Sequence, residues 1–454
     1  MMSHGTIVRV LRGLGLAAMA AFLTAESCPK DIGEGDRPGR YTVRVSLDKD
    51  GGQVLTPVSP AIGSERSSIS GDGRFVAFHS DSPQLAPGDG NGVQDVFVKD
   101  RATGAVELVS INTDAAVQSD YVSEDPSISA DGRFVAFVSF GDLGGGSYWT
   151  LPATRRQLFR YDRLLKVTRA VYAAGGQPNA DMYRPSISPD GRYVAFTSSA
   201  DEFGSLQTIV QTWLADLGDP NGPFTATVFT LISRTTGSPT TGGNGFCDEP
   251  RVCVLPGGAP FVVFTCNGDN LVAGTPTDAE TRVFGGSPGS VCEMISLTDA
   301  DVPSNGLCTN PSVSSDGRYV SFSAIATNIT GSILTPGLVA VRDRTLGTTT
   351  LVSYDSTGAP LTSSFFTSIS GDGQSVAFVS RPTTGGFQQV WVKTVGGAIQ
   401  IASVHLTEAI AADACFLPSL SADGRWVSWN TEATNLVTTD TNGQSDIFVR
   451  GPLR

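Results

Sequence analysis

The sequence predicts an all-β protein, a seven-bladed β-propeller of four-stranded antiparallel blades that is closed by its own N-terminal strand. Three observations carry this prediction. One motif returns along the chain at a nearly constant spacing, each repeat contains the signals of four strands, and a strand that is missing at the C-terminal end is present near the N-terminus.

The repeated motif is Ser-Ile-Ser-x-Asp-Gly-Arg followed by an aromatic-Val-Ala-Phe run. The aspartates of its six clear copies are spaced by 59, 59, 126, 56 and 51 residues. The gap of 126 is two periods, and a divergent copy lies within it at 250–264. A fixed period of this size indicates a repeat architecture, here of seven units. The six aspartates are Asp72, Asp131, Asp190, Asp316, Asp372 and Asp423.

Each repeat has the signals of four antiparallel strands. A short Ser-apolar-Ser strand turns on Asp-Gly, which favours a hairpin because glycine tolerates positive φ and aspartate can bond its own backbone. The Phe/Tyr-Val-Ala/Ser-Phe strand that follows is apolar on both faces, so we expect sheets to cover it on both sides. A third strand such as 95–101 and a fourth such as 106–110 complete one propeller blade. The recurring aspartates are therefore interpreted as turn residues.

The two ends of the chain predict how the ring closes. The last repeat supplies strands at 419–421, 426–429 and 446–450, and then lacks its fourth strand. Residues 41–46 read like a fourth strand, so we expect them to complete the last blade and leave no open edge. The predicted propeller spans 39–454, with blade cores near 68–110, 127–172, 186–234, 250–297, 312–354, 368–404, and 419–450 together with 41–46.

The repeat core, Ser-x-Asp-Gly-Arg-x-apolar-Ala-Phe, resembles the TolB-like (WD-like) propeller repeat of exported bacterial proteins. The resemblance covers about residues 39–454 and implies the propeller fold. TolB itself carries an α/β domain before a six-bladed propeller, whereas seven repeats and no such domain are expected here. The resemblance therefore does not identify the chain as TolB or imply its role in the Tol-Pal envelope system.

Residues 1–27 have the pattern of an export signal. Arg9 and Arg12 precede an apolar stretch at 14–23 that is too short to span a bilayer. Cys28 follows small residues and is a candidate for lipid attachment, although Ala25 stands where a lipobox usually has leucine. Residues 28–38 are rich in Pro, Gly and charge and are expected to form a tether. These features predict an exported protein that is periplasmic, anchored to the outer membrane or extracellular.

The formal net charge of −13 argues against a nucleic-acid partner, because phosphate binding depends on Lys and Arg contacts. Beyond the export signal, no hydrophobic stretch is long enough to predict a transmembrane span.

Six cysteines remain besides Cys28, and an even number in an exported chain favours disulfides, with fifteen pairings open. Three of them lie three residues before the proline that precedes a first strand, so we place them in the loops that cross between blades. The hairpin register places Cys266 opposite Cys247. Zinc is the alternative, but the chain has no CxxC pair and three histidines. The disulfide candidates are Cys247, Cys253, Cys266, Cys292, Cys308 and Cys415.

Two loops contain oxygen ligands around an Asn-Gly bend, a pattern that suits a hard cation such as calcium. They resemble part of the calcium loops of propellers and dockerin-like modules, without the leading aspartate of those loops. The alternative is a plain turn between the second and third strands. The candidate calcium ligands are Asp89, Asn91 and Asp95 in the first blade and Asp440, Asn442 and Asp446 in the last. No other cofactor is indicated.

No catalytic residue is assigned. His79 follows a core strand, His405 lies in an outer strand, and no serine stands in a Gly-x-Ser-x-Gly elbow. The acidic pairs 124–125 and 248–249, placed in inter-blade loops, are compatible with a sugar lyase or glycoside hydrolase or with solvated charge.

The sequence therefore favours a non-catalytic propeller at the bacterial cell envelope. We expect it to bind a protein or glycan on the face that carries the variable loops, because function is carried where loops vary. A catalytic propeller and a purely structural surface protein are the alternatives.

Overall fold

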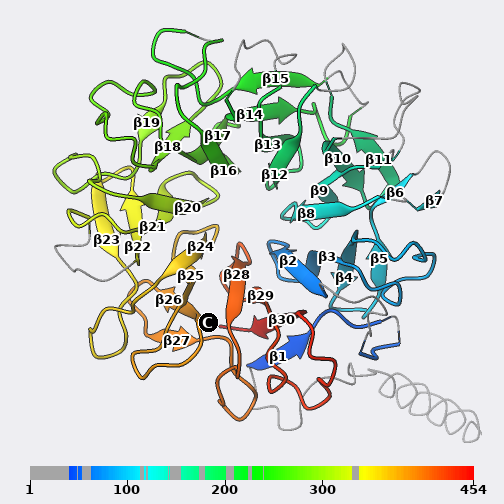
Figure 1. Ribbon diagram of the computed structural model, residues 1–454. Coiled ribbons are helices and arrows are strands. Elements are labelled where there is room, and N and C mark those ends of the chain that lie inside the picture. Colours follow the sequence, from blue (N-terminus) through cyan, green and yellow to red (C-terminus); the bar gives the residue numbers. More distant parts are fainter. Residues whose placement is uncertain are drawn as a thin grey trace, which may run out of the picture.

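The computed structural model describes residues 40–48, 50–53, 63–112, 117–118, 121–141, 143, 155–172, 179–200, 209–222, 227–238, 240–329 and 337–453. Within these ranges the regular structure consists of strands, and seven four-stranded antiparallel sheets form a closed ring (Figure 1). The predicted all-β, seven-bladed propeller is confirmed. The described residues contain no helix long and apolar enough to cross a membrane. The predicted export signal, Cys28 and the whole predicted tether lie outside the described residues.

Each blade runs from an innermost to an outermost strand, and blades are numbered here along the chain. The innermost strands are β2 (Ser64–Ile69), β8 (Ser123–Ile128), β12 (Met182–Ile187), β16 (Cys247–Val254), β20 (Cys308–Val313), β24 (Phe365–Ile369) and β28 (Cys415–Leu420). The second strands are β3 (Phe75–Ser80), β9 (Phe134–Ser139), β13 (Tyr193–Ser198), β17 (Pro260–Cys266), β21 (Tyr319–Ala324), β25 (Ser375–Ser380) and β29 (Val427–Thr431).

The third strands are β4 (Asp95–Asp100), β10 (Gln157–Asp162), β14 (Gln211–Asp216), β18 (Arg282–Gly286), β22 (Leu338–Asp343), β26 (Gln389–Thr394) and β30 (Asp446–Gly451). The outermost strands are β5 (Val106–Leu108), β11 (Val167–Ala170), β15 (Val228–Leu231), β19 (Glu293–Met294), β23 (Thr348–Leu351), β27 (Ile399–Ile401) and β1 (Tyr41–Arg44). A short hairpin, β6 (Ile111–Asn112) with β7 (Val117–Gln118), lies beside blade 1.

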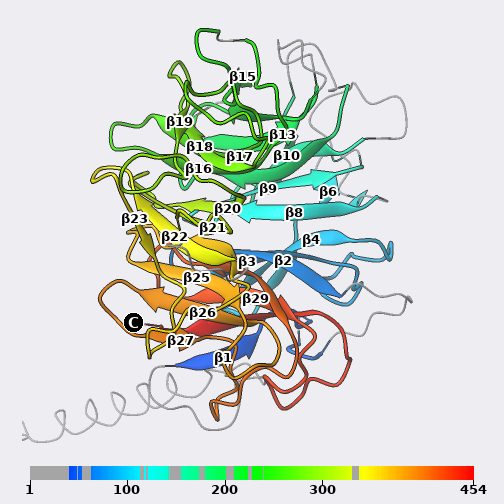
Figure 2. The same cartoon turned by 60° about the vertical axis from the view of Figure 1, so that its left-hand side comes forward.

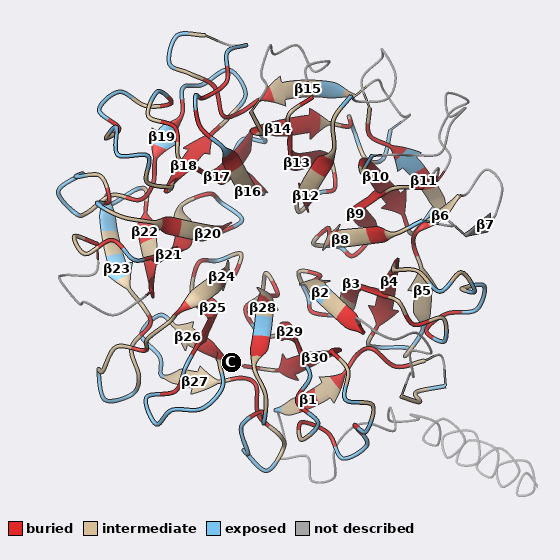
Figure 3. Cartoon of the chain, in the orientation of Figure 1, coloured by how far each residue is buried: buried red, intermediate tan, exposed pale blue. Residues whose placement is uncertain are grey.

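The core lies between neighbouring blades, where the second and third strands are buried along most of their length (Figure 3). Figure 2 shows the sheets lying one above another along the ring. Aromatic residues on paired strands stack within a blade, as Phe78 does on Phe97 at 5.9 Å between ring centroids. The all-apolar second strands thus behave as the sequence predicts, because a sheet covers each of their faces.

The N-terminal strand completes the last blade, as the sequence predicts. β1 pairs antiparallel with β30, with Tyr41 opposite Gly451 and Arg44 opposite Phe448. A backbone hydrogen bond from Val45 N to Ile447 O (2.7 Å) extends the pairing. Thr42 Oγ1 donates to the carbonyl oxygen of Val404 in blade 6 at 2.6 Å, so β1 also joins blade 7 to its neighbour.

The recurring aspartates are turn residues, as interpreted from their repetition. In blade 1 the Ser70 hydroxyl donates to Asp72 Oδ1 (2.7 Å), which also accepts from the backbone N–H of Arg74 (2.9 Å). The same serine oxygen accepts from the backbone N–H of Phe75 (2.9 Å). Equivalent bonds recur in blades 2, 3, 5, 6 and 7. The carboxylates therefore hold hairpins together.

In blades 1, 2, 3, 5 and 6 the glycine after this aspartate lies directly beneath a side chain of the preceding blade. A Cβ added to Gly132 would lie 2.1 Å from the ring of Phe75, and at Gly373 it would lie 2.2 Å from the ring of Tyr319. The Phe75 ring is also held between Arg74 of its own blade (4.7 Å) and Arg163 of blade 2 (4.2 Å). The Asp-Gly-Arg turn is thus an inter-blade contact as well as a hairpin, because the aromatic ring packs on a residue that must lack a Cβ.

Removing residues 1–47 takes away β1 and should destabilise the ring far more than removing residues 1–39. The longer deletion exposes the backbone of β30 and leaves the buried Arg450 and Asp446 without β1. We expect the melting temperature to fall by on the order of 10 °C or more, or the monomer to be lost. Equal melting temperatures of the two truncations in calorimetry would contradict closure by β1.

Two glycines of blade 6 separate backbone strain from inter-blade packing. Gly373 and Gly396 have φ of +70° and +68°, but a Cβ at Gly396 meets nothing within 4 Å. Gly396→Ala should cost only the left-handed strain of alanine, about 1 kcal/mol. Gly373→Ala should cost roughly 2 kcal/mol more, because Tyr319 must move. Urea unfolding of the two variants measures this difference, and similar losses would show that the ring of Tyr319 yields freely.

Candidate functional site

The most distinctive feature of the innermost strands is a bulge near the start of each one, at the third residue of six strands and at the second residue of β24. The residue there has φ between +43° and +55°, in the left-handed region. We call these residues the mouth ring. Its members are Arg66, Asp125, Arg184, Glu249, Asn310, Phe366 and Leu417.

All seven mouth-ring residues line one central cavity of about 480 Å³. A bulge leaves one residue of the strand unpaired and turns its side chain away from the regular alternation. Because every innermost strand runs from an inter-blade crossing to the turn that leads into the second strand, the bulge residue lies near the crossing face of the ring. The cavity mouth therefore opens on the face of the inter-blade crossings, where we expect a partner to bind.

Ion pairs occupy the part of the mouth ring that belongs to blades 1 to 4. Arg66 Nη1 lies 3.1 Å from Asp125 Oδ1, and Arg184 Nη1 lies 3.5 Å from Glu249 Oε1. Arg184 also pairs with Asp248 at 3.3 Å. Asn310 donates to both oxygens of Glu249, from its backbone N–H at 2.7 Å and from Nδ2 at 2.8 Å. Each of these carboxylates is thus already bound to a donor from a neighbouring blade.

Blades 6 and 7 contribute an apolar arc to the same ring. Phe366 and Leu417 are half-buried members of the cavity wall, next to Phe365 and Phe416. The Phe366 ring packs edge-on against Phe365 at 5.0 Å, and Phe416 is 38% exposed. One mouth therefore combines a charged side with an apolar side.

Two residues further along the innermost strands, a serine belt joins neighbouring blades. Each belt hydroxyl oxygen accepts the backbone N–H of an apolar residue in the following blade, at 2.9–3.3 Å. The belt serines are Ser68, Ser127, Ser186, Ser312, Ser368 and Ser419. Arg251 holds the seventh position, in blade 4.

The opposite end of the cavity is drawn together by backbone hydrogen bonds between blades. Gly71 N donates to Ala130 O (2.8 Å), Ala130 N to Pro189 O (3.0 Å), and Gly371 N to Ala422 O (2.9 Å). A Cβ added to Gly71 would lie 3.0 Å from Ala130 O. These bonds join the Asp-Gly turns of neighbouring blades on the face opposite the mouth ring.

The histidine nearest the mouth is held in a structural role. His79 is buried, and its Nδ1 accepts the backbone N–H of the mouth-ring residue Asp125 at 3.3 Å. Burial lowers the pKa of His79 to about 4, so the ring is neutral near neutral pH. His405 lies apart from the channel, in an exposed turn where its Nδ1 contacts Thr407.

The acidic pairs differ in position from the expectation. Glu124, Asp125, Asp248 and Glu249 lie within the innermost strands β8 and β16 rather than in inter-blade loops. The reason is that these strands begin earlier than the Ser-Ile-Ser motif and continue through the bulge. Glu124 is paired with Arg156 Nε at 2.6 Å.

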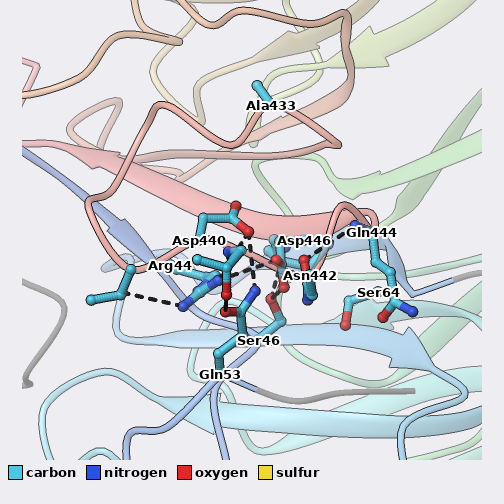
Figure 4. A network of polar contacts seen from close by, with 12 residues as sticks. Arg44, Ser46, Gln53, Ser64, Ala433, Asp440, Asn442, Gln444 and Asp446 are labelled. Carbon is cyan, nitrogen blue, oxygen red and sulfur yellow. Dashed lines mark hydrogen bonds and ion pairs between the residues drawn. The ribbon is translucent and has the colours of Figure 1, made fainter. Parts of the chain in front are cut away.

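The candidate calcium ligands of the last blade gather around an arginine (Figure 4). Arg44 Nη1 from β1 lies 3.4 Å from both Asp440 Oδ1 and Asp446 Oδ2, and all three side chains are buried. Ser46 Oγ donates to the other oxygen of Asp446, and Gln53 Nε2 donates to Asp440 Oδ1 at 3.1 Å. Asn442 Oδ1 accepts the backbone N–H of Gln444 at 3.1 Å, within the turn. A guanidinium from the closing strand thus supplies positive charge beside these carboxylates.

The first-blade loop is arranged around hydrogen bonds. Asp95 accepts from Ser110 Oγ (2.5 Å) and from Asn91 Nδ2 (3.0 Å). In blades 3 and 6 a glutamine, Gln211 or Gln389, takes the place of Asp95 and accepts from a serine in the same way. Among the described residues, no group of three His, Cys, Asp or Glu side chains could hold a metal ion. Calcium binding through Asp89 and the other loop residues stays a prediction.

Where the structure describes the chain, one disulfide is present, between Cys247 and Cys266, which lie opposite each other in β16 and β17 as the hairpin register predicts. The same place holds a serine pair in other blades, such as Ser64 with Ser80 at 3.1 Å. Three cysteines are predicted from the sequence to lie in the loops that cross between blades. They are instead the first residues of innermost strands: Cys247 of β16, Cys308 of β20 and Cys415 of β28.

The expected framework of several bridges among the six candidates is corrected to this single one, because the other four cysteines in the described part of the chain are unbonded. Cys253 packs between blades 4 and 5 and Cys292 between blades 3 and 4, on opposite faces of one sheet. Cys308 and Cys415 lie in blades 5 and 7. Burial raises the pKa of Cys253 and Cys308 to about 12, so both stay protonated thiols.

A second hollow, of about 590 Å³, lies at the outer edge between blades 4 and 5. Its arginines are engaged, Arg342 with Asp301 at 2.6 Å and Arg344 with Glu293. The central cavity is the stronger candidate site because all seven blades contribute equivalent residues to it.

No protein-family model matches the chain, and no curated protein matches it in sequence. Solved structures similar to it include TolB from Acinetobacter baumannii (14% identity, 84% of this chain and 81% of that chain, TM-score 0.39). Another is the β-propeller domain of the Trilobed protease from Pyrococcus furiosus (10% identity, 86% and 95%, TM-score 0.49). A third is the acylaminoacyl peptidase of Pyrococcus horikoshii (10% identity, 88% and 53%, TM-score 0.50), of which this chain spans about half the length. At these identities the likeness shows the propeller fold alone.

Asp446 should make stability depend on pH. Burial raises its pKa to about 6, against the opposing effect of Arg44. A carboxyl whose pKa is higher in the folded protein stabilises it below its unfolded pKa of about 4, and this contribution is lost as the pH rises through about 6. The free energy of unfolding of the wild-type protein should therefore fall more steeply between pH 4 and 6 than that of the Asp446→Asn variant, which lacks this titration.

Asp278→Asn is the matched control. A hydrogen bond from Arg282 lowers the pKa of Asp278 to about 2, so its contribution is present above pH 4 and lost as the pH falls toward 2. Urea unfolding from pH 3 to 8 measures both variants. Parallel curves for wild type and Asp446→Asn across pH 4–6 would contradict the prediction.

Proposed function

We propose that the chain is a non-catalytic binding propeller that takes an extended segment of a protein partner into the mouth of its central cavity. In this proposal the protein is exported to the bacterial cell envelope, with Cys28 as the site of a lipid anchor. The observation that carries the proposal is the composition of the mouth ring, an ion-paired side in blades 1 to 4 facing an apolar arc in blades 6 and 7.

The two sides of the mouth suit different parts of a peptide. Arg66 and Arg184 keep 44% and 40% of their side-chain surface exposed while pairing with carboxylates, so each retains N–H donors for a backbone carbonyl or an acidic side chain. Phe366 and Leu417 offer apolar surface to a hydrophobic side chain. An extended chain presents both kinds of group at a spacing of a few ångströms.

The state of the carboxylates favours binding over catalysis. A glycosidase needs two carboxyl groups free to act as acid and base or nucleophile. Asp125 is paired with Arg66, and Glu249 is held by Arg184 and Asn310. Both would have to leave these partners to react. A sugar lyase or glycoside hydrolase therefore remains the alternative rather than the proposal.

A protein partner is favoured over a glycan by the shape of the apolar arc. Sugar rings stack on broad, exposed aromatic faces, whereas Phe366 packs edge-on against Phe365 and is half-buried. The exposed ring of Phe416 is the feature that suits a glycan. A purely structural role would leave the arc without any ligand.

Selection of a displayed library of random linear peptides on the immobilised protein tests the proposal. Enriched peptides should bind the double variant Phe366→Asn, Leu417→Asn at least about tenfold more weakly in fluorescence anisotropy, since two apolar contacts are lost. Asparagine is chosen because Asn310 holds the same left-handed place in blade 5, so the backbone should be preserved.

Val395→Asn is the control, since Val395 is 60% exposed in the β26–β27 turn on the opposite face, and it should leave peptide affinity unchanged. Equal affinity of the double variant and wild type would exclude the mouth as the site. Release of product from a sugar polymer by the purified protein would overturn the non-catalytic assignment, and glycan binding without peptide binding would replace the protein partner by a glycan.

A further inference from the structure

We infer that the serine belt, with Arg251 in its seventh place, is an oxyanion site inside the channel. It lies deeper than the mouth ring and would accept a carboxylate or phosphate group. The inference concerns a different level of the cavity from the proposed function and does not depend on it.

The hydroxyl oxygen of each belt serine accepts a hydrogen bond, but its hydroxyl hydrogen is not donated to an acceptor in the described part of the chain. Each oxygen accepts a backbone N–H from the following blade, and no acceptor among the described residues receives the hydroxyl hydrogen. All six serines line the cavity. A hydroxyl that accepts through a lone pair can rotate its hydrogen toward the lumen, so the belt presents up to six donors around one axis.

Arg251 brings a permanent positive charge to this ring of donors. It lines the cavity, is exposed to it, and donates from Nη1 to the carbonyl oxygen of Pro250 at 2.8 Å. No described carboxylate lies within ion-pair distance of its guanidinium, in contrast to Arg66 and Arg184. Hydroxyl and guanidinium groups that converge on an oxyanion form charge-assisted hydrogen bonds, which are stronger than neutral ones.

The nearby carboxylates form their ion pairs and hydrogen bonds with residues other than Arg251. Asp125, Asp248 and Glu249 are engaged by the two mouth-ring arginines and by Asn310. Desolvation inside the channel lowers the pKa of Arg251; Glu249 and Asp248 oppose this effect, and Arg184 and Arg66 add to it. An oxyanion beside the guanidinium would stabilise its charged form.

The shape of the cavity determines how an oxyanion could arrive. The mouth ring and the belt line the same cavity, and the mouth ring lies nearer the face of the inter-blade crossings. The oxyanion would therefore enter past the mouth ring, either as a free ion or as the acidic group of a longer molecule. The chemistry recognised at the belt is the same in both cases.

Isothermal titration of the full chain at constant ionic strength tests the inference, with inorganic phosphate and the peptide Gly-Gly-Asp as probes and fully amidated Gly-Gly-Asn as the neutral comparison. Wild type should bind phosphate or Gly-Gly-Asp but not the neutral peptide. Arg251→Ser should weaken that binding by at least about tenfold, because it removes the charge. This variant should fold, since six blades have serine in the same place and its melting temperature can be checked directly.

Arg425→Ser is the control with the same change of charge. Arg425 is exposed in the Asp-Gly turn of blade 7, on the opposite face, and its loss should leave phosphate binding unchanged. Tighter binding of Gly-Gly-Asp than of phosphate would assign the site to a carboxylate on an inserted molecule, and the reverse to a free ion. Both results support the oxyanion site.

Two outcomes would overturn the inference. In the first, the wild-type protein binds neither phosphate nor Gly-Gly-Asp. In the second, the Arg251→Ser variant binds phosphate as tightly as the wild-type protein. The variant Phe366→Asn, Leu417→Asn should keep phosphate binding, so a failure of the peptide proposal at the mouth and a failure of the oxyanion site give different results.

Discussion

The pairing of β1 with β30 is the constraint on which the rest of the molecule depends. β1 is the outermost strand of blade 7, and the chain leads from it into blade 1, so this pairing ties the first part of the chain to the last. It supports the seam where β2 of blade 1 packs on β28 and β29 of blade 7. The channel depends on the same closure, because the belt runs across it: Ile69 N of blade 1 donates to Ser419 Oγ of blade 7 at 3.3 Å. Mouth ring and belt are therefore properties of the closed ring and of no single blade.

The channel shows how a repeated backbone carries an unequal set of side chains. The bulge and its left-handed residue occur in all seven innermost strands, so the backbone of the mouth is nearly the same in each blade. What differs is the side chain, which ranges from Arg66 through Asn310 to Phe366. Likewise one substitution in the belt, arginine for serine at position 251, introduces a charge without altering the strand. Specificity can thus be set at single positions while the turns and inter-blade contacts stay constant.

The blades, the Asp-Gly hairpins and the closing strand could be predicted from the sequence because each depends on local patterns. The mouth ring could not be predicted from the sequence, because its bulges follow from how the strands pair. In addition, Arg66, Asp125 and Phe366 have no chemistry in common that would show that they occupy equivalent positions. An alignment of the repeats on their Ser-apolar-Ser motif would have shown Arg251 as the exception. The role of Arg44 beside Asp440 and Asp446 was missed because a separation of about 400 residues gives no local signal.

The antiparallel pairing of β1 also determines how the ring responds to mechanical force. A pull on the chain before β1 enters the molecule at Tyr41, whose partner is Gly451, and reaches Arg44 after the other three residues of the strand. The strand would therefore peel, breaking one pair at a time, rather than resist as a whole in shear. The buried ion pairs of Arg44 with Asp440 and Asp446 lie at the end of β1 that is pulled away last. They would therefore still hold the strand after its first pairs have broken.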